Sequence, residues 1–225
     1  MNIWIQAYGR TGSTTLFRAL KYVLDNHWGF SEPYLNENNS VTGKLYQDTK
    51  KLMNVKNDYD FYKLKNIIIK NNQWQTPFDN INRDSPIEEF FKFHKVVNKN
   101  FDKVILLGRK DEFDWAISSY QSHQSEKYST PYNWNESNNY LIDEGRLDIG
   151  RRWKQFLIEL SKNIYHKKIT WYEDLYSEDE AVRLKQFLDW DIPFTENDIK
   201  ILLDLTHPKH RYRRDNNKPI KKESR

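Results

Sequence analysis

Residues 8–16 read YGRTGSTTL, and this stretch decides the fold. The residues before it, Asn2–Tyr8, form a short apolar run, which predicts a buried strand. Thr14–Asn26 then carry apolar residues at helical spacing. A strand, a glycine-containing turn and a helix in this order predict a P-loop-like start to an α/β domain.

The turn itself has the features of an anion-binding loop. Gly9 and Gly12 allow the backbone to turn sharply and to approach a ligand closely. The amides of residues 11–15 would then face an anion at the positive end of the helix. A triphosphate loop has a lysine after its last glycine, followed by a hydroxyl that holds Mg²⁺. Here Arg10 precedes Gly12 and no lysine follows, which disfavours a magnesium–triphosphate site and predicts an anion held without a metal.

The composition limits the classes of protein to consider. With 225 residues we expect one domain, residues 1–225, with a sizeable core. The absence of cysteine excludes disulfides and thiolate metal sites. The net charge of +4 does not by itself distinguish a binder of small anions from a binder of nucleic acid. No apolar run approaches the ~20 residues that span a bilayer. We expect a soluble cytoplasmic protein that binds neither nucleic acid nor membrane, and the oligomeric state stays open.

The rest of the chain alternates predicted strands and helices. Residues 33–60 are polar and predict surface loop with a short helix, residues 125–145 predict an excursion over the acceptor side, and residues 206–225 a basic tail. Further strands are predicted at 66–70, 103–109 and 168–172, and helices at 86–100, 111–123, 147–165, 178–190 and 197–205. This alternation predicts a three-layer α/β fold around a mainly parallel sheet.

Two basic residues end predicted strands, Lys70 and Arg109. Ligands of such sheets bind at the carboxyl ends of the strands, so both side chains are expected beside the loop at 9–15. An arginine there takes a phosphate bidentately, with a helix hydroxyl from Ser118 or Ser119 as the second donor.

Three segments in order resemble the sulfotransferases that use 3′-phosphoadenosine 5′-phosphosulfate (PAPS). They are GRTGSTT at 9–15, VILLGRKDEFDWAISSY at 104–120, and WYEDL at 171–175 with LKQFLDW at 184–190. The resemblance implies that the 3′-phosphate lies on Arg109 and Ser118. It also implies a set of residues on the 5′-phosphosulfate: Arg10, Thr11, Gly12, Ser13, Thr14 and Thr15.

The chain departs from the family pattern at two places. The family usually separates its arginine and serine by eight positions, and the gap here is nine, which leaves Ser119 as an alternative to Ser118. The family's late Arg-Lys-Gly nucleotide clamp has no clean counterpart. Its candidates are Arg211, Arg213 and Arg214, for which a solvated tail is the competing interpretation.

The family transfers the sulfuryl group by in-line displacement without a metal, and the resemblance assigns catalytic roles. Arg10 would neutralise the departing phosphate, and Lys70 would lie near the bridging oxygen. Glu32, in GFSEPYL, follows the first predicted helix, where a second short strand is expected to return to the same sheet edge. It resembles the general base of the carbohydrate and tyrosylprotein types. His94, in KFH, resembles the K-T-H histidine of the cytosolic type, but it falls in the helix predicted at 86–100, so Glu32 is favoured.

The sequence therefore favours a sulfotransferase that acts on an acceptor hydroxyl of a small molecule or a glycan. The reaction would convert PAPS into 3′-phosphoadenosine 5′-phosphate (PAP). The Glu-Pro pair tilts the choice towards a carbohydrate. Aromatic residues of the acceptor-side excursion are candidates to stack on a sugar: Tyr128, Tyr132, Trp134 and Tyr140. The alternatives are a catalytically inactive sulfotransferase-like protein that binds PAP or a glycan, and, less favoured, a P-loop nucleotide kinase.

Overall fold

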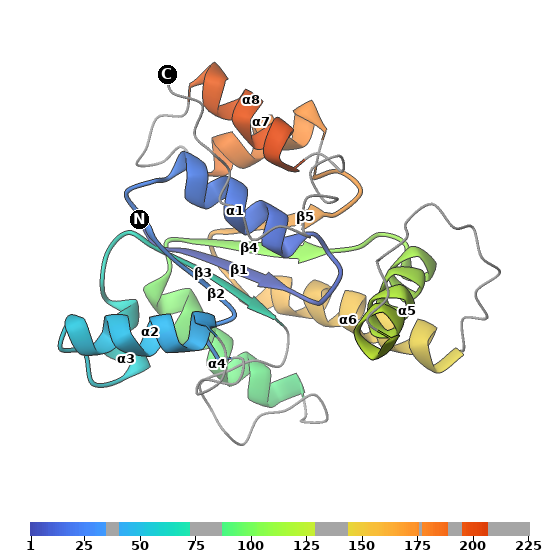
Figure 1. Ribbon diagram of the computed structural model, residues 1–225, viewed down its shortest axis with the longest axis horizontal. Coiled ribbons are helices and arrows are strands. Elements are labelled where there is room, and N and C mark those ends of the chain that lie inside the picture. Colours follow the sequence, from blue (N-terminus) through green and yellow to red (C-terminus); the bar gives the residue numbers. More distant parts are fainter. Residues whose placement is uncertain (35–40, 73–86, 129–143, 176, 189–194, 207–225) are drawn as a thin grey trace.

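The structure is a computed structural model, and it describes residues 1–34, 41–72, 87–128, 144–175, 177–188 and 195–206. The described chain forms a parallel sheet between two layers of helices (Figure 1). The strands are β1 (Ile3–Ala7), β2 (Trp28–Ser31), β3 (Ile67–Asn72), β4 (Lys103–Gly108) and β5 (Lys167–Trp171). The helices are α1 (Ser13–Val23), α2 (Val41–Leu52), α3 (Asp58–Tyr62), α4 (Ile87–Asn100), α5 (Glu112–Tyr128), α6 (Glu144–Asn163), α7 (Glu178–Leu188) and α8 (Glu196–Thr206).

The sheet has the strand order β2-β3-β1-β4-β5, and every pair in it is parallel. β1 lies in the centre between β3 and β4, so the turn that follows β1 opens at the middle of one sheet edge (Figure 1). All five strands end at that edge because they run in the same direction. This arrangement confirms the predicted three-layer α/β fold with its P-loop-like strand, turn and helix.

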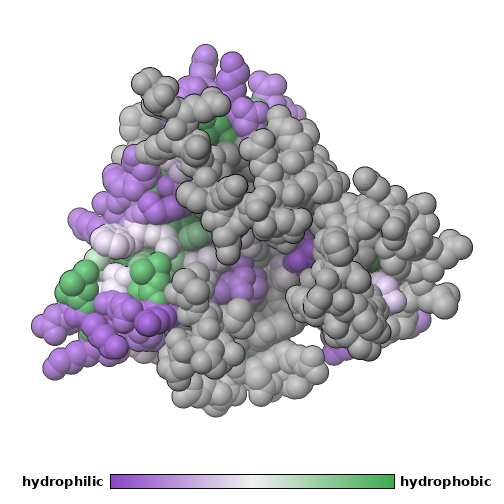
Figure 2. Space-filling model, in the orientation of Figure 1, coloured by the Kyte–Doolittle hydropathy of each residue, from purple (hydrophilic) through white to green (hydrophobic). Residues whose placement is uncertain are grey.

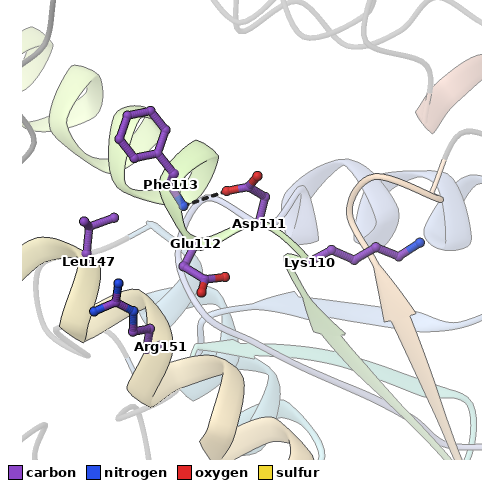
Figure 3. Close-up of a pocket in the computed structure, with 6 residues that line it drawn as sticks. All are labelled: Lys110, Asp111, Glu112, Phe113, Leu147 and Arg151. Atoms are coloured by element: carbon purple, nitrogen blue, oxygen red, sulfur yellow. Dashed lines mark hydrogen bonds between the residues drawn. The ribbon is translucent and has the colours of Figure 1, made fainter.

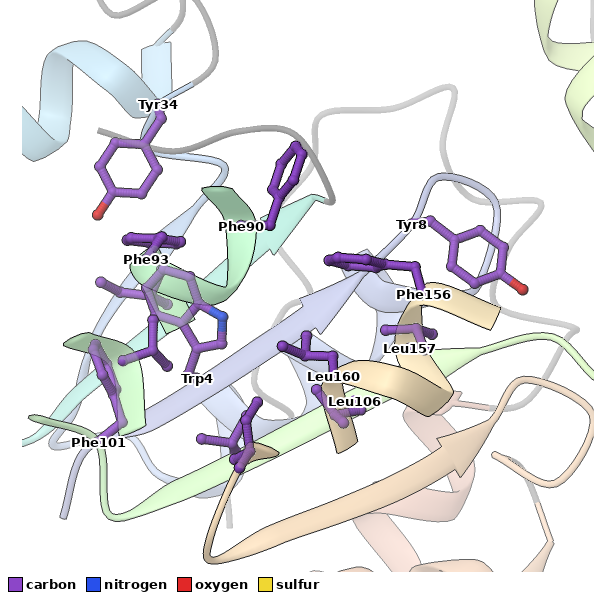
Figure 4. Close-up of a cluster of buried hydrophobic side chains, with 14 of the residues drawn as sticks. Trp4, Tyr8, Tyr34, Phe90, Phe93, Phe101, Leu106, Phe156, Leu157 and Leu160 are labelled. Atoms are coloured by element: carbon purple, nitrogen blue, oxygen red, sulfur yellow. The ribbon is translucent and has the colours of Figure 1, made fainter. Parts of the chain in front are cut away.

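Alternating side chains of β1 serve two separate cores. Ile3 and Ile5 pack towards α1, α7 and α8 on one face, whereas Trp4 packs into an aromatic core under α3, α4 and α6 on the other. The Trp4 ring meets Phe93 at 5.4 Å and Phe101 at 5.0 Å between centroids, both edge to face (Figure 4). Both faces of β1 are therefore covered by packed helices up to the turn that follows it.

The predicted boundaries are wrong mainly around residues 33–60. That stretch holds two helices, α2 and α3, where the sequence predicts loop with one short helix. α5 continues to Tyr128, beyond the predicted end at His123, and α6 begins at Glu144, before the predicted start at Leu147. The centre of the excursion predicted at 125–145 lies outside the described residues, which omit 129–143.

The α2–α3 region buries part of its apolar surface and exposes the rest. Phe61 and Tyr46 are buried in the aromatic core, while Leu45 and Leu52 face solvent. Figure 2 shows apolar surface among hydrophilic side chains on the side where Figure 1 places these helices. The interleaving of buried and exposed apolar residues explains why this stretch lacks a clear amphipathic pattern.

Candidate active site

The turn between β1 and α1 is built on two left-handed backbone positions. Arg10 has φ 70° and Gly12 has φ 76°. A Cβ at Gly12 would lie 2.9 Å from the Tyr172 ring and 3.3 Å from Leu175, so this position requires glycine for space as well as for conformation. At Gly9 a Cβ would meet nothing within 4 Å. The turn therefore requires glycine at position 12. The expectation that Gly9 is also needed for space is not supported.

Side chains within and beside the turn hold its shape. The buried Thr11 hydroxyl donates to the Tyr8 carbonyl at 2.7 Å. The indole of Trp115, from α5, donates to the Gly9 carbonyl at 2.7 Å. The Thr11 hydroxyl is thus engaged in the turn itself, which leaves its backbone amide as the part that suits the predicted phosphosulfate contact.

Helix α1 begins directly at the turn and points its amino end at the sheet edge. The amides of Thr15 and Leu16 both donate to the Gly12 carbonyl at 3.0 Å. The amides of Ser13 and Thr14 belong to the first turn, where amides lack an acceptor within the helix. No acidic residue stands in this first turn. The helix therefore offers amides and an unneutralised positive end to an anion.

Lys70 brings a buried cation to the same place. Its side chain is 2% exposed, and its ammonium group forms an ion pair with the Glu32 carboxylate. The same ammonium group lies 3.3 Å from the Thr14 hydroxyl at the start of α1. β3 turns its neighbours Ile69 and Asn71 to the other face, so the strand period directs Lys70 towards α1. The loop itself has no lysine, but Lys70 on β3 brings an ammonium group to the start of α1.

Glu32 directly follows β2, the second strand, in agreement with the expectation of a short strand before it. Its backbone amide donates to the Lys70 carbonyl at 2.7 Å, which continues the pairing of β2 with β3. Its φ is 57°, so Glu32 and Arg10 both adopt the left-handed conformation that side chains other than glycine, Asn and Asp rarely take. Such strain is concentrated at functional sites in proteins. The carboxylate remains reachable, since the Glu32 side chain is 21% exposed.

Arg109 forms a second basic position at the end of β4. It is buried, and its guanidinium carbon lies 4.1 Å from the centre of the Tyr172 ring. The Tyr8 hydroxyl accepts from the Arg109 amide at 2.9 Å. Burial raises the pKa of the Tyr8 phenol to about 12, so this hydroxyl stays protonated at neutral pH. Tyr172 touches both Arg109 and the space beside Gly12, and it thereby links the two predicted phosphate-binding positions.

Arg10 connects the turn to α5. Its Nε donates to the Ser118 hydroxyl at 3.4 Å, across 108 positions of sequence. Ser118 is 4% exposed. The structure therefore brings Ser118, one of the two serines predicted for the 3′-phosphate, to the loop.

His94 lies away from these groups, in the aromatic core. Its Nδ1 donates to the Phe90 carbonyl at 2.7 Å, and its Nε2 lies 3.1 Å from the Gln6 side-chain oxygen. Burial lowers its pKa from 6.5 to about 4. The residue belongs to the face of the sheet opposite α1, whereas Lys70 points towards α1. The structure thus brings Glu32, and not His94, to Lys70.

A hollow of about 530 Å³ adjoins the Arg109 side of the site. Its described lining comprises Lys110, Asp111, Glu112, Phe113, Leu147 and Arg151. Figure 3 shows Glu112 at the start of α5 and Arg151 on α6, while Lys110 points away towards β5. Glu112 forms its ion pair with Lys154, and Arg151 forms one with Glu144. Glu32 follows β2 and the hollow follows β4, so β3 and β1 lie between the hollow and Glu32.

Sequence reasoning assigned no role to Tyr8, Trp115 or Tyr172, which all support the site. Tyr172 lies in the recognised WYEDL segment at the end of a strand next to β4, and that position was the available signal. The candidate clamp residues Arg211, Arg213 and Arg214 lie outside the described residues, as do the aromatic candidates Tyr132, Trp134 and Tyr140. The side chain of Tyr128 is likewise not described.

Among the described residues, no group of three or more His, Cys, Asp or Glu side chains is arranged to hold a metal ion. No helix in the same residues has the length and apolar character needed to cross a membrane.

No protein-family model and no curated protein sequence matches the chain. Similar solved structures include shikimate kinase from Acinetobacter baumannii in complex with shikimate, at 14% identity and a TM-score of 0.46, covering 85% of this chain and 94% of that one. YorR from Bacillus subtilis, in complex with phosphorylated GDP, has 15% identity and a TM-score of 0.45, with coverage of 84% and 95%. Retinol dehydratase, in complex with androsterone and the inactive cofactor PAP, has 13% identity and a TM-score of 0.42, with coverage of 93% and 65%. Likenesses this distant do not bear on the reaction, so the function rests on the residues of the site.

Proposed function

We propose that this protein is a sulfotransferase that moves the sulfuryl group of PAPS to an acceptor hydroxyl. The observation that carries the proposal is the position of the Lys70 ammonium group, between the Thr14 hydroxyl at the start of α1 and the Glu32 carboxylate. An anion-binding helix end, a buried cation and a reachable carboxylate are thereby in one place. These are the groups that a transfer between a phosphate oxygen and a hydroxyl requires.

The donor set of the site suits a nucleotide with two separate anionic groups. The 5′-phosphosulfate would lie on the turn and on the first residues of α1: Arg10, Thr11, Gly12, Ser13, Thr14 and Thr15. The 3′-phosphate would lie on Arg109 and Ser118. The Arg10–Ser118 contact supports this division, because it places the two groups of residues side by side. Arginine is well suited to both positions, since its planar group binds phosphate oxygens bidentately.

The chemistry follows from three side chains. Glu32 takes the proton of the acceptor hydroxyl as its oxygen forms a bond to sulfur. The bond from sulfur to the bridging phosphate oxygen breaks, and its electron pair stays on the phosphate of the departing PAP. Lys70 and Arg10 stabilise the charge that develops there. Lys70 pairs with Glu32 in the present structure, so attraction of the ammonium group to the donor would release the carboxylate to act as base.

The acceptor is proposed to be a small molecule or a glycan, with a carbohydrate hydroxyl favoured by the resemblance of the Glu32-Pro33 pair to carbohydrate sulfotransferases. It would approach Glu32 from the edge of the sheet at β2. The hollow beside Arg109 lies on the other side of the site, so it is not where the reacting hydroxyl would bind.

Binding and turnover test this proposal separately. Isothermal titration calorimetry with PAP, without added metal, should show one site per chain, and Arg109→Ala should weaken it. A panel of sugars incubated with protein and PAPS should then yield sulfated product by mass spectrometry. PAP binding without any turnover would favour the inactive PAP-binding alternative, and absence of PAP binding would refute the donor site.

A further inference from the structure

Three tyrosine hydroxyls are buried together beside the segment that carries Glu32. Tyr34 and Tyr62 share a hydrogen bond between their hydroxyl groups. The Tyr46 hydroxyl donates to Asp58 Oδ1 at 2.7 Å, and Lys50 forms an ion pair with the same oxygen at 2.8 Å. Burial raises the pKa of all three phenols well above 10, so they remain protonated hydrogen-bonding groups.

Burying three tyrosine hydroxyls together is less favourable than filling the same space with apolar rings. A phenylalanine would bury a similar area without a polar group that needs a partner, because an unsatisfied buried hydroxyl is destabilising. The Tyr34 ring lies over Phe93 in the aromatic core, where apolar packing alone would hold a ring (Figure 4). The hydroxyls of Tyr34 and Tyr62 therefore call for an explanation beyond packing.

The position of Tyr34 in the chain supplies one. Tyr34 is separated from Glu32 only by the buried Pro33. On its amino-terminal side Glu32 is held by the hydrogen bond from its amide to the Lys70 carbonyl. On its carboxyl-terminal side the next anchored side chain is Tyr34, which is tied to Tyr62. The left-handed Glu32 backbone is thus fixed at both ends.

We propose that Tyr34 is a positioning residue, whose hydrogen bond to Tyr62 fixes the chain just beyond Glu32 and holds that carboxylate against Lys70. The inference rests on the proposed function of Glu32 as general base. A non-glycine residue in this conformation is strained, and the conformation persists only where the surroundings impose it. Loss of the anchor lets Glu32 relax to negative φ, which turns the carboxylate away from Lys70.

The test removes only the hydroxyl, with Tyr34→Phe. The expected result is a loss of kcat of about 10–100-fold, because small displacements of a catalytic group have effects of this size. The affinity for PAP, measured by calorimetry, stays unchanged because the phosphate-binding residues are untouched. Tyr62→Phe removes the same bond from its other side and should reproduce the effect. The double variant should lose less kcat than the product of the two single losses, since both single variants already lack the Tyr34–Tyr62 bond.

Thr49→Val is the matched control. It also deletes a buried hydroxyl in this region, one that donates to the Leu45 carbonyl at 2.8 Å within α2. It should lower stability without changing kcat. Equal losses of kcat in Thr49→Val and Tyr34→Phe would reduce the effect to general destabilisation and overturn the proposal.

A crystal structure of Tyr34→Phe separates this inference from the proposed function. Displacement of Glu32 from Lys70 supports the inference, even if the wild-type protein transfers no sulfuryl group and the proposed function falls. A Glu32–Lys70 pair that is unchanged in Tyr34→Phe, with Glu32 still at positive φ, overturns the inference whatever the activity. Should Tyr34→Phe not fold, the same structure of Tyr62→Phe decides.

Discussion

Replacing His94 with glutamine removes a buried titratable group while keeping a hydrogen-bonding side chain beside Gln6. His94 is 2% exposed, and the rings packed against it belong to Phe93 and Phe156. Its pKa falls from 6.5 to about 4 because burial disfavours the charged imidazolium. One pKa unit corresponds to about 1.4 kcal/mol, so the loss of stability on full protonation is about 3 kcal/mol.

The sign of the effect follows from which state binds the proton first. As pH falls, the unfolded chain protonates this histidine near pH 6.5, whereas the folded protein does so only near pH 4. The stabilising contribution of neutral His94 is therefore complete above pH 6.5, is lost between pH 6.5 and about 4, and changes no further below that. Glutamine does not titrate, so His94→Gln should lack this component of the pH dependence.

The assay is urea unfolding followed by tryptophan fluorescence, at several values between pH 7.5 and pH 4, for both proteins. The difference in free energy of unfolding, wild type minus His94→Gln, should fall by about 3 kcal/mol over that range. Other carboxylates and histidines titrate equally in both proteins and cancel. A difference independent of pH would show that His94 is not held neutral in the core.

The variant should also keep its sulfuryl-transfer activity at neutral pH, and loss of turnover with PAP binding intact would return His94 to the list of candidate bases.

Further substitutions test the loop and the second phosphate position. Arg10→Gly should be about 1 kcal/mol more stable than Arg10→Ala in chemical unfolding, since glycine tolerates φ 70°; equal stabilities would contradict the strained backbone. Gly12→Ala should lower the free energy of unfolding by ~1–3 kcal/mol and weaken PAP binding, because its Cβ would meet the Tyr172 ring at 2.9 Å; an unaffected melting temperature would refute this. Arg109→Ala should weaken PAP binding ~10–100-fold in calorimetry, as expected for charge-assisted hydrogen bonds, whereas Lys110→Ala, at an exposed cation next to it, should change little. Similar affinities in these two variants would displace the 3′-phosphate from Arg109.

The sequence was sufficient to predict the central features of the site because they depend on short-range patterns. The apolar run that ends in Lys70 predicts a strand and puts the lysine at its carboxyl end. The run that ends in Arg109 does the same for β4. In a parallel sheet these ends meet at one edge, which is where the structure has them. The placement of Glu32 followed from the same rule.

The tyrosine cluster was not predictable, since its residues come from three separate segments of the chain: Tyr34 beyond β2, Tyr46 in α2 and Tyr62 in α3. In α2 the buried positions include the polar residues Thr49 and Lys50 along with Tyr46, so the helix has no clean apolar stripe. Long-range pairing, such as that of Tyr34 with Tyr62 across 28 positions, depends on how α3 packs and cannot be derived from local propensity. The Arg10–Ser118 contact depends in the same way on the rotation of α5 about its axis.

The rate of sulfuryl transfer from PAPS by Glu32→Gln, measured beside the wild type, tests the central claim most directly. Glutamine keeps the size and shape of the side chain but cannot accept the proton of the acceptor hydroxyl. The account predicts that turnover falls by ~10²–10⁴-fold, as for the loss of a general base, while the Kd for PAP stays close to that of the wild type. A wild-type protein that transfers sulfate, together with a Glu32→Gln variant that does so at a similar rate, would contradict the role of Glu32 at this site.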